Sequence, residues 1–424
     1  MTVALVYAVL RLTVHGAYLA MMLTPNAGAM GGMPAWTEAD GEPMLPVDLQ
    51  IYLDAAHRFQ QREPLYVRSN RIEIYQYPPL YALAFIPFLW LSPVANAIIH
   101  SLLQVAAYAL LYASWDRIFH QLGLERARET LAWTLPIWLV FSSFWSDLSY
   151  ANIYIVMTLL GTLLIGAILR ERLGWSALWL TVILQIKPHW AFAAAIPLLL
   201  GRHRFFLKLA GLTTVSTAII LGSAMLITDP GYVWRQLVGY AQFLPHVVRD
   251  FPWRSPGSGF LGYNHSIKQI VFYLRDVSPR TRRLATGIKL LLLTPLGLTA
   301  GLSLRQSSST PPWHAPVRAL DLAFALYLGV FIWLDMVWEA SLSMALFPYL
   351  LATLEQTLTK TLAWAVFLPY ALIDAWQLVS LVLFGMDVIA PGPYVLTDLS
   401  IYVPIVMIVI LAFYLMLLRR LWVA

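Results

Sequence analysis

Long apolar segments recur along the chain, and short polar loops separate them. They lie at residues 3–23, 94–115, 131–145, 152–169, 174–186, 189–201, 208–228, 285–303, 318–334, 340–354, 360–385 and 399–418. Many are at the short end of the roughly 17–25 residues that a membrane-spanning helix needs. The pattern predicts an all-α polytopic membrane protein with about 12 transmembrane helices, within a range of roughly 11–13.

Two longer polar stretches, residues 24–93 and 229–284, interrupt this pattern. The first contains a segment that indicates a short amphipathic juxtamembrane helix, with the apolar residues Leu49, Ile51, Leu53, Ala56 and Phe59. Further on, the run YPPLYALAFIPFLWLSP contains four prolines, so we interpret it as an interfacial or re-entrant element. We expect one transmembrane domain, residues 1–424, with both long loops folded onto it.

The composition supports membrane insertion, and the basic residues predict its direction. Hydrophobic residues make up 59% of the chain, charged residues 12%, and the mean hydropathy is +0.68. With both termini in the cytoplasm, the short outer loops contain only Lys187, whereas the inner loops contain Arg117, Arg126, Arg128, Arg170, Arg172, Arg202, Arg204, Lys208, Arg305, Arg318, Lys360, Arg419 and Arg420. Because cytoplasmic loops concentrate Lys and Arg, the net charge of +6 reflects sidedness and predicts no nucleic-acid partner.

On this map the polar chemistry collects on the outer face, beginning with Asp48 in the first long loop. Asp48 could be part of an external active or binding face, but an aspartate at this position could also simply be the N-cap of the amphipathic helix. Asp54 could form an ordinary helix pair with Arg58.

Two further motifs offer groups that suit phosphates and sugars. IKPHW places Lys187 and His189 at an outer turn, where a cation could hold the phosphate of a lipid-linked substrate or snorkel to lipid headgroups. GYNHSIKQ contributes Asn264 and His265, whose donors and acceptors suit sugar hydroxyls or phosphate oxygens, although such a triplet could be purely structural.

Acids flanked by aromatic residues mark two more outer turns. SDLSYANIY contains Asp147 and Asn152, and LDMVWEAS contains Asp335 and Glu339. Each acid could simply cap the helix that follows it. Within the apolar segments, Arg11 and Asp374 are charges at a depth where such groups pair or face a cavity, so we expect these two side chains to pair with each other.

Several classes of function are not supported by any motif. The chain has no HExxH, no cysteine and no P-loop. We therefore expect no metal, no other cofactor and no soluble nucleotide donor.

The order of these motifs resembles the glycosyltransferase-C superfamily, and most closely its family 87, which contains polyprenyl-phosphate-mannose-dependent mannosyltransferases of actinobacteria. The resemblance rests on Asp48, Leu49, Tyr52, Ala55, Ala56, Leu65, Tyr66, Tyr77, Pro78, Pro79, Leu80, Asn152, Lys187, Pro188, Asn264 and Ser266. The chain differs from its relatives at Asn152, where they have a glutamine, and near Glu339, where VWEAS replaces a His-containing turn.

The resemblance implies a polytopic helical fold of the GT-C type in a bacterial plasma membrane, with an extracytoplasmic active site. It implies an inverting transfer of a hexose, with mannose expected, from a polyprenyl-phosphate sugar to a hydroxyl of a glycolipid or glycan. It also makes Asp48 the catalytic base.

For the remaining site residues we expect two roles. The donor phosphate would be bound by Lys187, His189, His265 and Arg254, and the substrates would contact Tyr52, Tyr77, Asn152, Asn264 and Glu339. A transporter or flippase for a lipid-linked substrate is the alternative, although such proteins usually show paired inverted halves, which this sequence lacks. A ligase that uses a polyprenyl-diphosphate glycan is a third possibility, and it would favour arginines over Lys187 at the phosphate site.

Overall fold

Helices account for all the regular structure in the ranges that the computed structural model describes, namely residues 1–22, 45–67, 75–306, 315–386, 388 and 399–423. The predicted all-α class is therefore confirmed for these residues. Six helices are long and apolar enough to cross a membrane, at Thr2–Ala20, Pro93–Gln121, His203–Ile227, Pro279–Leu302, Pro316–Trp333 and Ile405–Trp422. Two bent helix pairs raise the number to eight if each pair is one span.

The predicted count of about 12 spans is not confirmed, because several predicted segments form helices shorter than a full span. Residues 174–186 form α9 (Leu173–Ile186), and residues 340–354 form α16 (Ser343–Thr353). Residues 189–201 form a 3₁₀ helix, η3 (Pro188–Ala195), followed by the single turn α10 (Ile196–Leu199).

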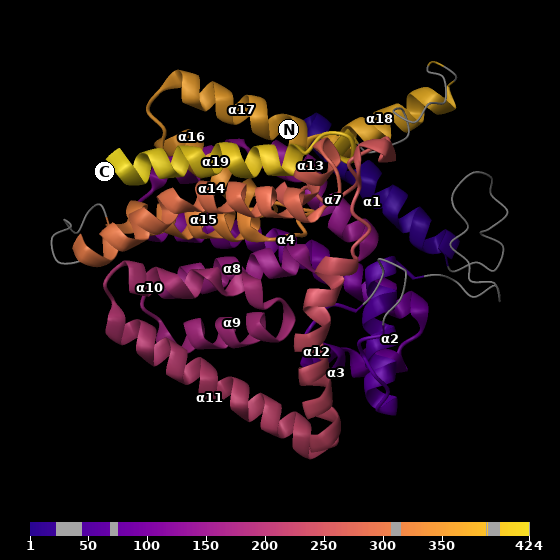
Figure 1. Cartoon of the computed structure of the whole chain (residues 1–424). Coiled ribbons are helices and arrows are strands. Elements are labelled where there is room, and N and C mark those ends of the chain that lie inside the picture. The colour runs from indigo at the N-terminus through magenta and orange to yellow at the C-terminus, as the bar shows by residue number, and fades with distance from the viewer. Residues whose placement is uncertain (23–44, 68–74, 307–314, 387, 389–398, 424) are drawn as a thin grey trace.

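Most of the long helices run side by side in one bundle (Figure 1). Besides α9 and α16, its members are α4 (Pro93–Gln121), α5 (Glu125–Trp133), α8 (Tyr154–Leu169), α14 (Pro279–Gln306), α15 (Ala315–Trp333) and α19 (Ile405–Val423). α15 packs along α19, and α8 packs between α4 and α9. Flanking helices complete the fold, namely α1 (Thr2–Met22), α11 (His203–Ile227), α17 (Thr357–Ala371) and α18 (Ile373–Gly385).

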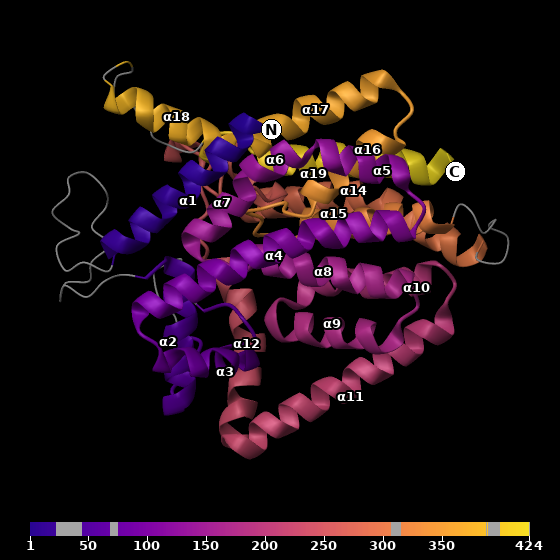
Figure 2. The ribbon, with the colours of Figure 1, turned by 180° about the vertical axis from the view of Figure 1, so that it is seen from behind.

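A second group of helices runs across one end of the bundle, and both views agree on this placement (Figure 2). It comprises α2 (Val47–Gln61), α3 (Pro79–Phe85) with η2 (Ile86–Trp90), and α12 (Pro230–Asp250). The amphipathic helix predicted in the first long loop is thus present as α2. The YPPL run forms α3, which begins at its second proline because a proline at the first helical position needs no hydrogen-bonded N–H. α2 contacts α7 (Ser142–Tyr150), and α3 contacts α9.

Two apolar helical segments break at this end of the bundle. The segment formed by α6 (Leu135–Val140) and α7 turns by 116° before α8, and the turn contains Asn152. Lys187 lies at the second break, between α9 and η3. Irregular backbone among apolar helices is tolerated where it is buried in protein or lines a cavity, so both breaks are natural places for a site.

The break at Lys187 is fixed by close packing against α8. Trp190 is 1% exposed, and a Cβ on Gly161 would lie only 3.3 Å from its ring carbon Cε3. The ring also packs against Tyr327 and Phe331 of α15, with centroid distances of 5.5 and 5.7 Å. A rigid aromatic core therefore holds the backbone on the C-terminal side of Lys187.

The predicted pairing of Arg11 with Asp374 is confirmed. Arg11 of α1 donates from Nε and Nη2 to the two carboxylate oxygens of Asp374, at 2.7 and 2.9 Å. Tyr7 also donates to Asp374. This network joins α1 to the start of α18 across most of the sequence.

The remaining short elements connect the larger ones. They are η4 (Pro256–Ser258), α13 (Ile267–Leu274) and η6 (Leu399–Ile401). α13 begins at the N-cap Ser266, whose hydroxyl accepts a hydrogen bond from the N–H of Gln269 at 3.2 Å.

Candidate active site

Asp48 lies in the first turn of α2, and a residue from the bundle holds its side chain. Pro46 is the N-cap of α2, and no side-chain hydrogen bond caps this helix. The N-cap interpretation of Asp48 is therefore wrong: the helix begins one residue before it. Instead, Asn152 donates from Nδ2 to Oδ2 of Asp48 at 2.9 Å, across 104 positions of sequence. This bond fixes the carboxylate where the end layer meets the bundle.

Asn152 is itself held in the turn between α7 and α8. Ala151 adopts the left-handed conformation there, with φ 51°, which reverses the chain. The Oδ1 of Asn152 accepts a hydrogen bond from the N–H of Ile153 at 2.6 Å, and its carbonyl accepts one from the Gln104 side chain of α4. Its amide N–H₂ group is thereby left to face Asp48.

Asp147 caps the helix that follows the same turn, as the capping interpretation proposed. Its two carboxylate oxygens accept hydrogen bonds from the N–H groups of Tyr154 and Ile155, at 3.1 and 2.8 Å. Its side chain is nearly fully buried. An acceptor at this position satisfies backbone donors that have no partner within the helix, and the cap fixes the start of α8.

Lys187 is a buried cation whose ammonium rests on aromatic faces. Its Nζ lies 3.5 Å from the ring centroid of Tyr154 and 5.2 Å from that of Tyr77. The residue is only 9% exposed, yet within the described ranges its ammonium forms no hydrogen bond and no ion pair. Burial lowers the pKa of the Lys187 ammonium to about 8, although the charges of Asp48 and Asp147 act in the opposite direction.

Glu339 completes the polar group from the loop between α15 and α16. Its Oε2 accepts a hydrogen bond from the Tyr370 hydroxyl at 2.9 Å, and that hydroxyl accepts one from the N–H of Ala340 at 3.0 Å. Glu339 is close enough for its charge to act on Asp147 and on the hydroxyl of Tyr154. Two helix breaks, the start of α2 and one loop thus bring Asp48, Asn152, Lys187 and Glu339 into one neighbourhood.

Tyr52 and Tyr77 lie beside this group as part of an aromatic cluster. Their hydroxyls are 2.9 Å apart, and their rings meet edge to face with centroids 5.2 Å apart. Tyr81 packs edge to face against Tyr52 and at a tilt against Tyr77. Tyr52 is fully buried, and the charge of Asp48 acts on both hydroxyls. The cluster packs α2 against α3 and supports Asp48.

His189 adjoins Lys187 and is partly buried, with its ring centroid 6.4 Å from that of Phe331. Of the residues predicted to bind the donor phosphate, Lys187 and His189 thus lie together where α9 gives way to η3. Within the described chain, no group of three or more His, Asp and Glu side chains is arranged to hold a metal ion.

A family comparison places this arrangement among known proteins. The model of glycosyltransferase family 87 matches residues 75–335, which is more than half of the chain. The chain belongs to glycosyltransferase family 87. No curated protein matches it. The family match includes Tyr77, Asn152 and Lys187, whereas Asp48 lies before it and Glu339 after it.

The predicted residues of the second long loop have different surroundings in this membrane glycosyltransferase. Asn264 donates to the carbonyl of Asp335 at 3.0 Å, and His265 accepts a hydrogen bond at Nδ1 from the N–H of Val406 at 3.2 Å. Arg254 stacks on Phe260, with Cζ 4.4 Å from the ring centroid. None of these contacts reaches Lys187, so the structure ties the loop to α19 and to the α15–α16 loop.

A charge cluster that the sequence analysis missed joins α13 to α14 and to the α15–α16 loop of this family 87 protein. Lys268 and Lys289 donate to opposite oxygens of Asp335, at 2.9 and 2.5 Å. Both lysines are nearly fully buried. The capping interpretation of Asp335 is therefore wrong, because its carboxylate binds two ammonium groups. An Asp between two buried Lys residues distant in sequence gives no local signal of this pairing.

Proposed function

We propose that this family 87 glycosyltransferase transfers a hexose, with mannose expected, from a polyprenyl-phosphate sugar to a hydroxyl of a glycolipid or glycan acceptor. The reaction takes place on the extracytoplasmic face of a bacterial plasma membrane. Asp48 is the general base, and Lys187, with His189 beside it, binds the donor phosphate. Membrane lipids surround the bundle.

The observation that carries the proposal is the ammonium of Lys187, buried without a hydrogen bond or ion pair among the described residues and electrostatically linked to Asp48. A buried charge is costly unless it is paired. The ammonium is also not fully covered by neighbouring atoms, so it is open to an incoming group. A phosphate diester on a lipid would supply the missing negative charge.

The chemistry follows from these two groups. The acceptor oxygen forms a bond to the anomeric carbon while the bond from that carbon to the phosphate oxygen breaks. The acceptor's proton passes to the Asp48 carboxylate, which Asn152 orients. The electron pair of the broken bond leaves with the lipid phosphate, which gains a second negative charge. The ammonium of Lys187 stabilises that charge most strongly as it develops. Attack opposite the leaving group inverts the anomeric centre.

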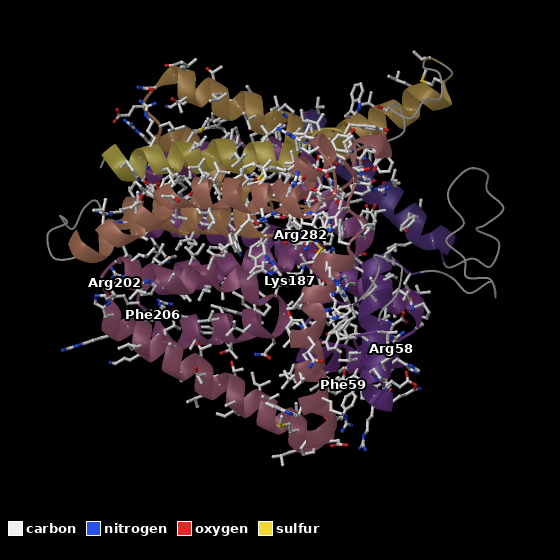
Figure 3. All side chains as sticks on the ribbon, in the orientation of Figure 1. Arg58, Phe59, Lys187, Arg202, Phe206 and Arg282 are labelled. Carbon is white, nitrogen blue, oxygen red and sulfur yellow. The ribbon has the colours of Figure 1, made fainter. Side chains whose placement is uncertain are left out.

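The placement of charges along the bundle supports an outer site. Figure 3 shows Lys187 at the end of the bundle next to α12 and α2, and Arg202 at the opposite end. Arg202 is one of the basic residues that the loop count assigned to the cytoplasm, where Lys and Arg concentrate. Lys187 and Arg202 therefore lie at opposite ends of the bundle, which supports the proposal.

The proposal is tested by replacing the base while keeping its shape. Purified protein in detergent is given a radiolabelled polyprenyl-phosphate hexose and a glycolipid acceptor, and labelled product is counted. We expect Asp48→Asn to lower kcat by about 10²–10⁴-fold, the usual contribution of general-base catalysis. Asp54→Asn is the matched control, because Asp54 is on the exposed face of the same helix and accepts a hydrogen bond from Gln50. It should retain full activity.

Two results would overturn the proposal. One is turnover by Asp48→Asn at the rate of the Asp54→Asn control. The other is transfer from a soluble nucleotide sugar with none from the lipid-linked donor. Movement of the lipid-linked sugar across vesicles without formation of a glycosidic bond would instead support a transporter.

A further inference from the structure

Tyr154 occupies the centre of the polar group, and none of the roles assigned so far includes it. It is the first residue of α8, and its N–H donates to Asp147 at 3.1 Å. The ammonium of Lys187 rests on its ring, 3.5 Å from the centroid. The charges of Asp48, Asp147 and Glu339 all act on its hydroxyl. The residue is therefore fixed by its backbone and by a cation on its ring.

The hydroxyl of Tyr154 has no partner in the described part of the chain. The residue is 9% exposed, and buried tyrosine hydroxyls usually find a hydrogen-bond partner. Among the neighbouring hydroxyls, those of Tyr52 and Tyr77 bind each other and that of Tyr370 binds Glu339, whereas that of Tyr81 is fully covered and has no partner. The Tyr154 hydroxyl is not fully covered by neighbouring atoms, so an incoming ligand can reach it.

We propose that Tyr154 is a donor-binding residue whose hydroxyl donates a hydrogen bond to the phosphate of the lipid-linked sugar, beside Lys187. The inference rests on the proposed function and adds a second phosphate contact to it. The ammonium of Lys187 is in direct contact with the ring of Tyr154. A phosphate bound by this ammonium therefore comes within reach of the Tyr154 hydroxyl, which is why the phosphate, rather than the sugar, is the partner.

A neutral donor suits this position better than a second cation. The charges of Asp48, Asp147 and Glu339 act on the hydroxyl, and an additional lysine or arginine would be neutralised by these acids. A phenol O–H adds a hydrogen bond to an anion without forming such an ion pair. A hydrogen bond to a charged group typically changes affinity by about ten- to a hundredfold.

The test is Tyr154→Phe, which keeps the ring under Lys187 and removes only the hydroxyl. Two constants are measured: KM for the polyprenyl-phosphate hexose, and Ki for polyprenyl phosphate, which carries no sugar. We expect both to rise together by about ten- to a hundredfold. Tyr108→Phe is the matched control, because Tyr108 of α4 donates its hydroxyl to the carbonyl of Trp138 at 2.7 Å, outside the site. It should change neither constant.

Each remaining outcome decides the question. A rise in KM for the donor with an unchanged Ki for polyprenyl phosphate would mean that the hydroxyl contacts the sugar, and it would overturn the proposal. Wild-type constants in Tyr154→Phe, with an active wild-type protein, would overturn this inference and leave the proposed function standing. If the wild-type protein neither uses the lipid-linked donor nor is inhibited by polyprenyl phosphate, both proposals fail together.

Discussion

The protein buries lysine ammonium groups in two regions, and the regions treat them in opposite ways. Beside α14, Lys268 and Lys289 share the carboxylate of Asp335, and Lys289 also donates to the carbonyl of Trp333 at 2.7 Å. At the break after α9, Lys187 has aromatic rings beneath it and, among the described residues, no partner for its N–H groups. Both regions include aromatic rings, since Lys268 lies 4.3 Å from the ring centroid of Trp253.

The difference separates a structural charge from one that is available to a ligand. At Asp335 burial alone would raise the pKa of the carboxyl, but the hydrogen bonds and charges of Lys289 and Lys268 outweigh burial and lower it. That cluster is satisfied within the fold and joins the second long loop to the bundle. At Lys187 the charges of Asp48 and Asp147 offset burial only in part, since the pKa is still lowered, so a bound anion would complete its surroundings.

The largest effect should come from breaking the satisfied cluster. Asp335→Asn leaves two buried ammonium groups without their counter-charge, and losing one partner of a buried pair typically costs about 3–5 kcal/mol. We expect a marked fall in the midpoint of thermal unfolding in detergent. Asp54→Asn, at an exposed acid, provides the reference and should unfold as the wild type does. Equal stability of the two variants would show that the Asp335 cluster does not hold the fold together.

The same logic predicts the reverse pattern at Lys187. Lys187→Met removes a charge that has no protein partner, so stability should be unchanged or slightly higher, while kcat/KM for the lipid-linked donor falls about ten- to a hundredfold. Kinetics and thermal unfolding are measured on one preparation. Lys268→Met is the contrasting variant. It removes one of the two ammonium groups that the Asp335 carboxylate binds, so it should be destabilising. Equal midpoints of thermal unfolding for Lys187→Met and Lys268→Met would contradict the distinction between the two regions.

The smallest effect is a pH dependence. Lys187 is charged below its pKa of about 8 and neutral above it. Because kcat/KM reports the ionisation of the free enzyme, its value for the donor should fall as the pH rises above that point and level off at no more than the loss seen in Lys187→Met. In Lys187→Arg the guanidinium stays charged, so the fall should disappear, even if the absolute rate is lower. A wild-type profile that stays flat to pH 10 would contradict a role for this ammonium.

Sequence reasoning succeeded where one residue's environment decides its partner. A charge inside an apolar helix needs a counter-charge, which made the pairing of Arg11 with Asp374 predictable. An acid in the short polar stretch between two apolar segments can cap the helix that follows, which made the role of Asp147 predictable. The same rule failed for Asp48, because Pro46 ends the extended backbone and starts α2 before Asp48. Because the helix begins one residue before Asp48, the side chain of Asp48 does not cap it and instead accepts a hydrogen bond from Asn152.

Other features could not be predicted because they depend on contacts between distant segments. Tyr154 is unremarkable as one aromatic residue after ANI, and its role becomes visible only when Lys187 is placed on its ring. Lys268 lies in the second long polar stretch of the sequence, although the fold buries it against Asp335, 67 positions away. The apolar segments on either side of Lys187, residues 174–186 and 189–201, are shorter than a full span already in the sequence, but the sequence does not show that the break between them lies against Tyr154. In each case the missing information is where the helices break and which break faces which.

The link between Arg11 and Asp374 also has a consequence for how the protein is made. The arginine leaves the ribosome 363 residues before the aspartate that neutralises it. A lone arginine in the middle of an apolar helix costs about 2.5–3.5 kcal/mol on insertion. The insertion cost of the first helix is therefore fully compensated only after Asp374 of α18 has been synthesised.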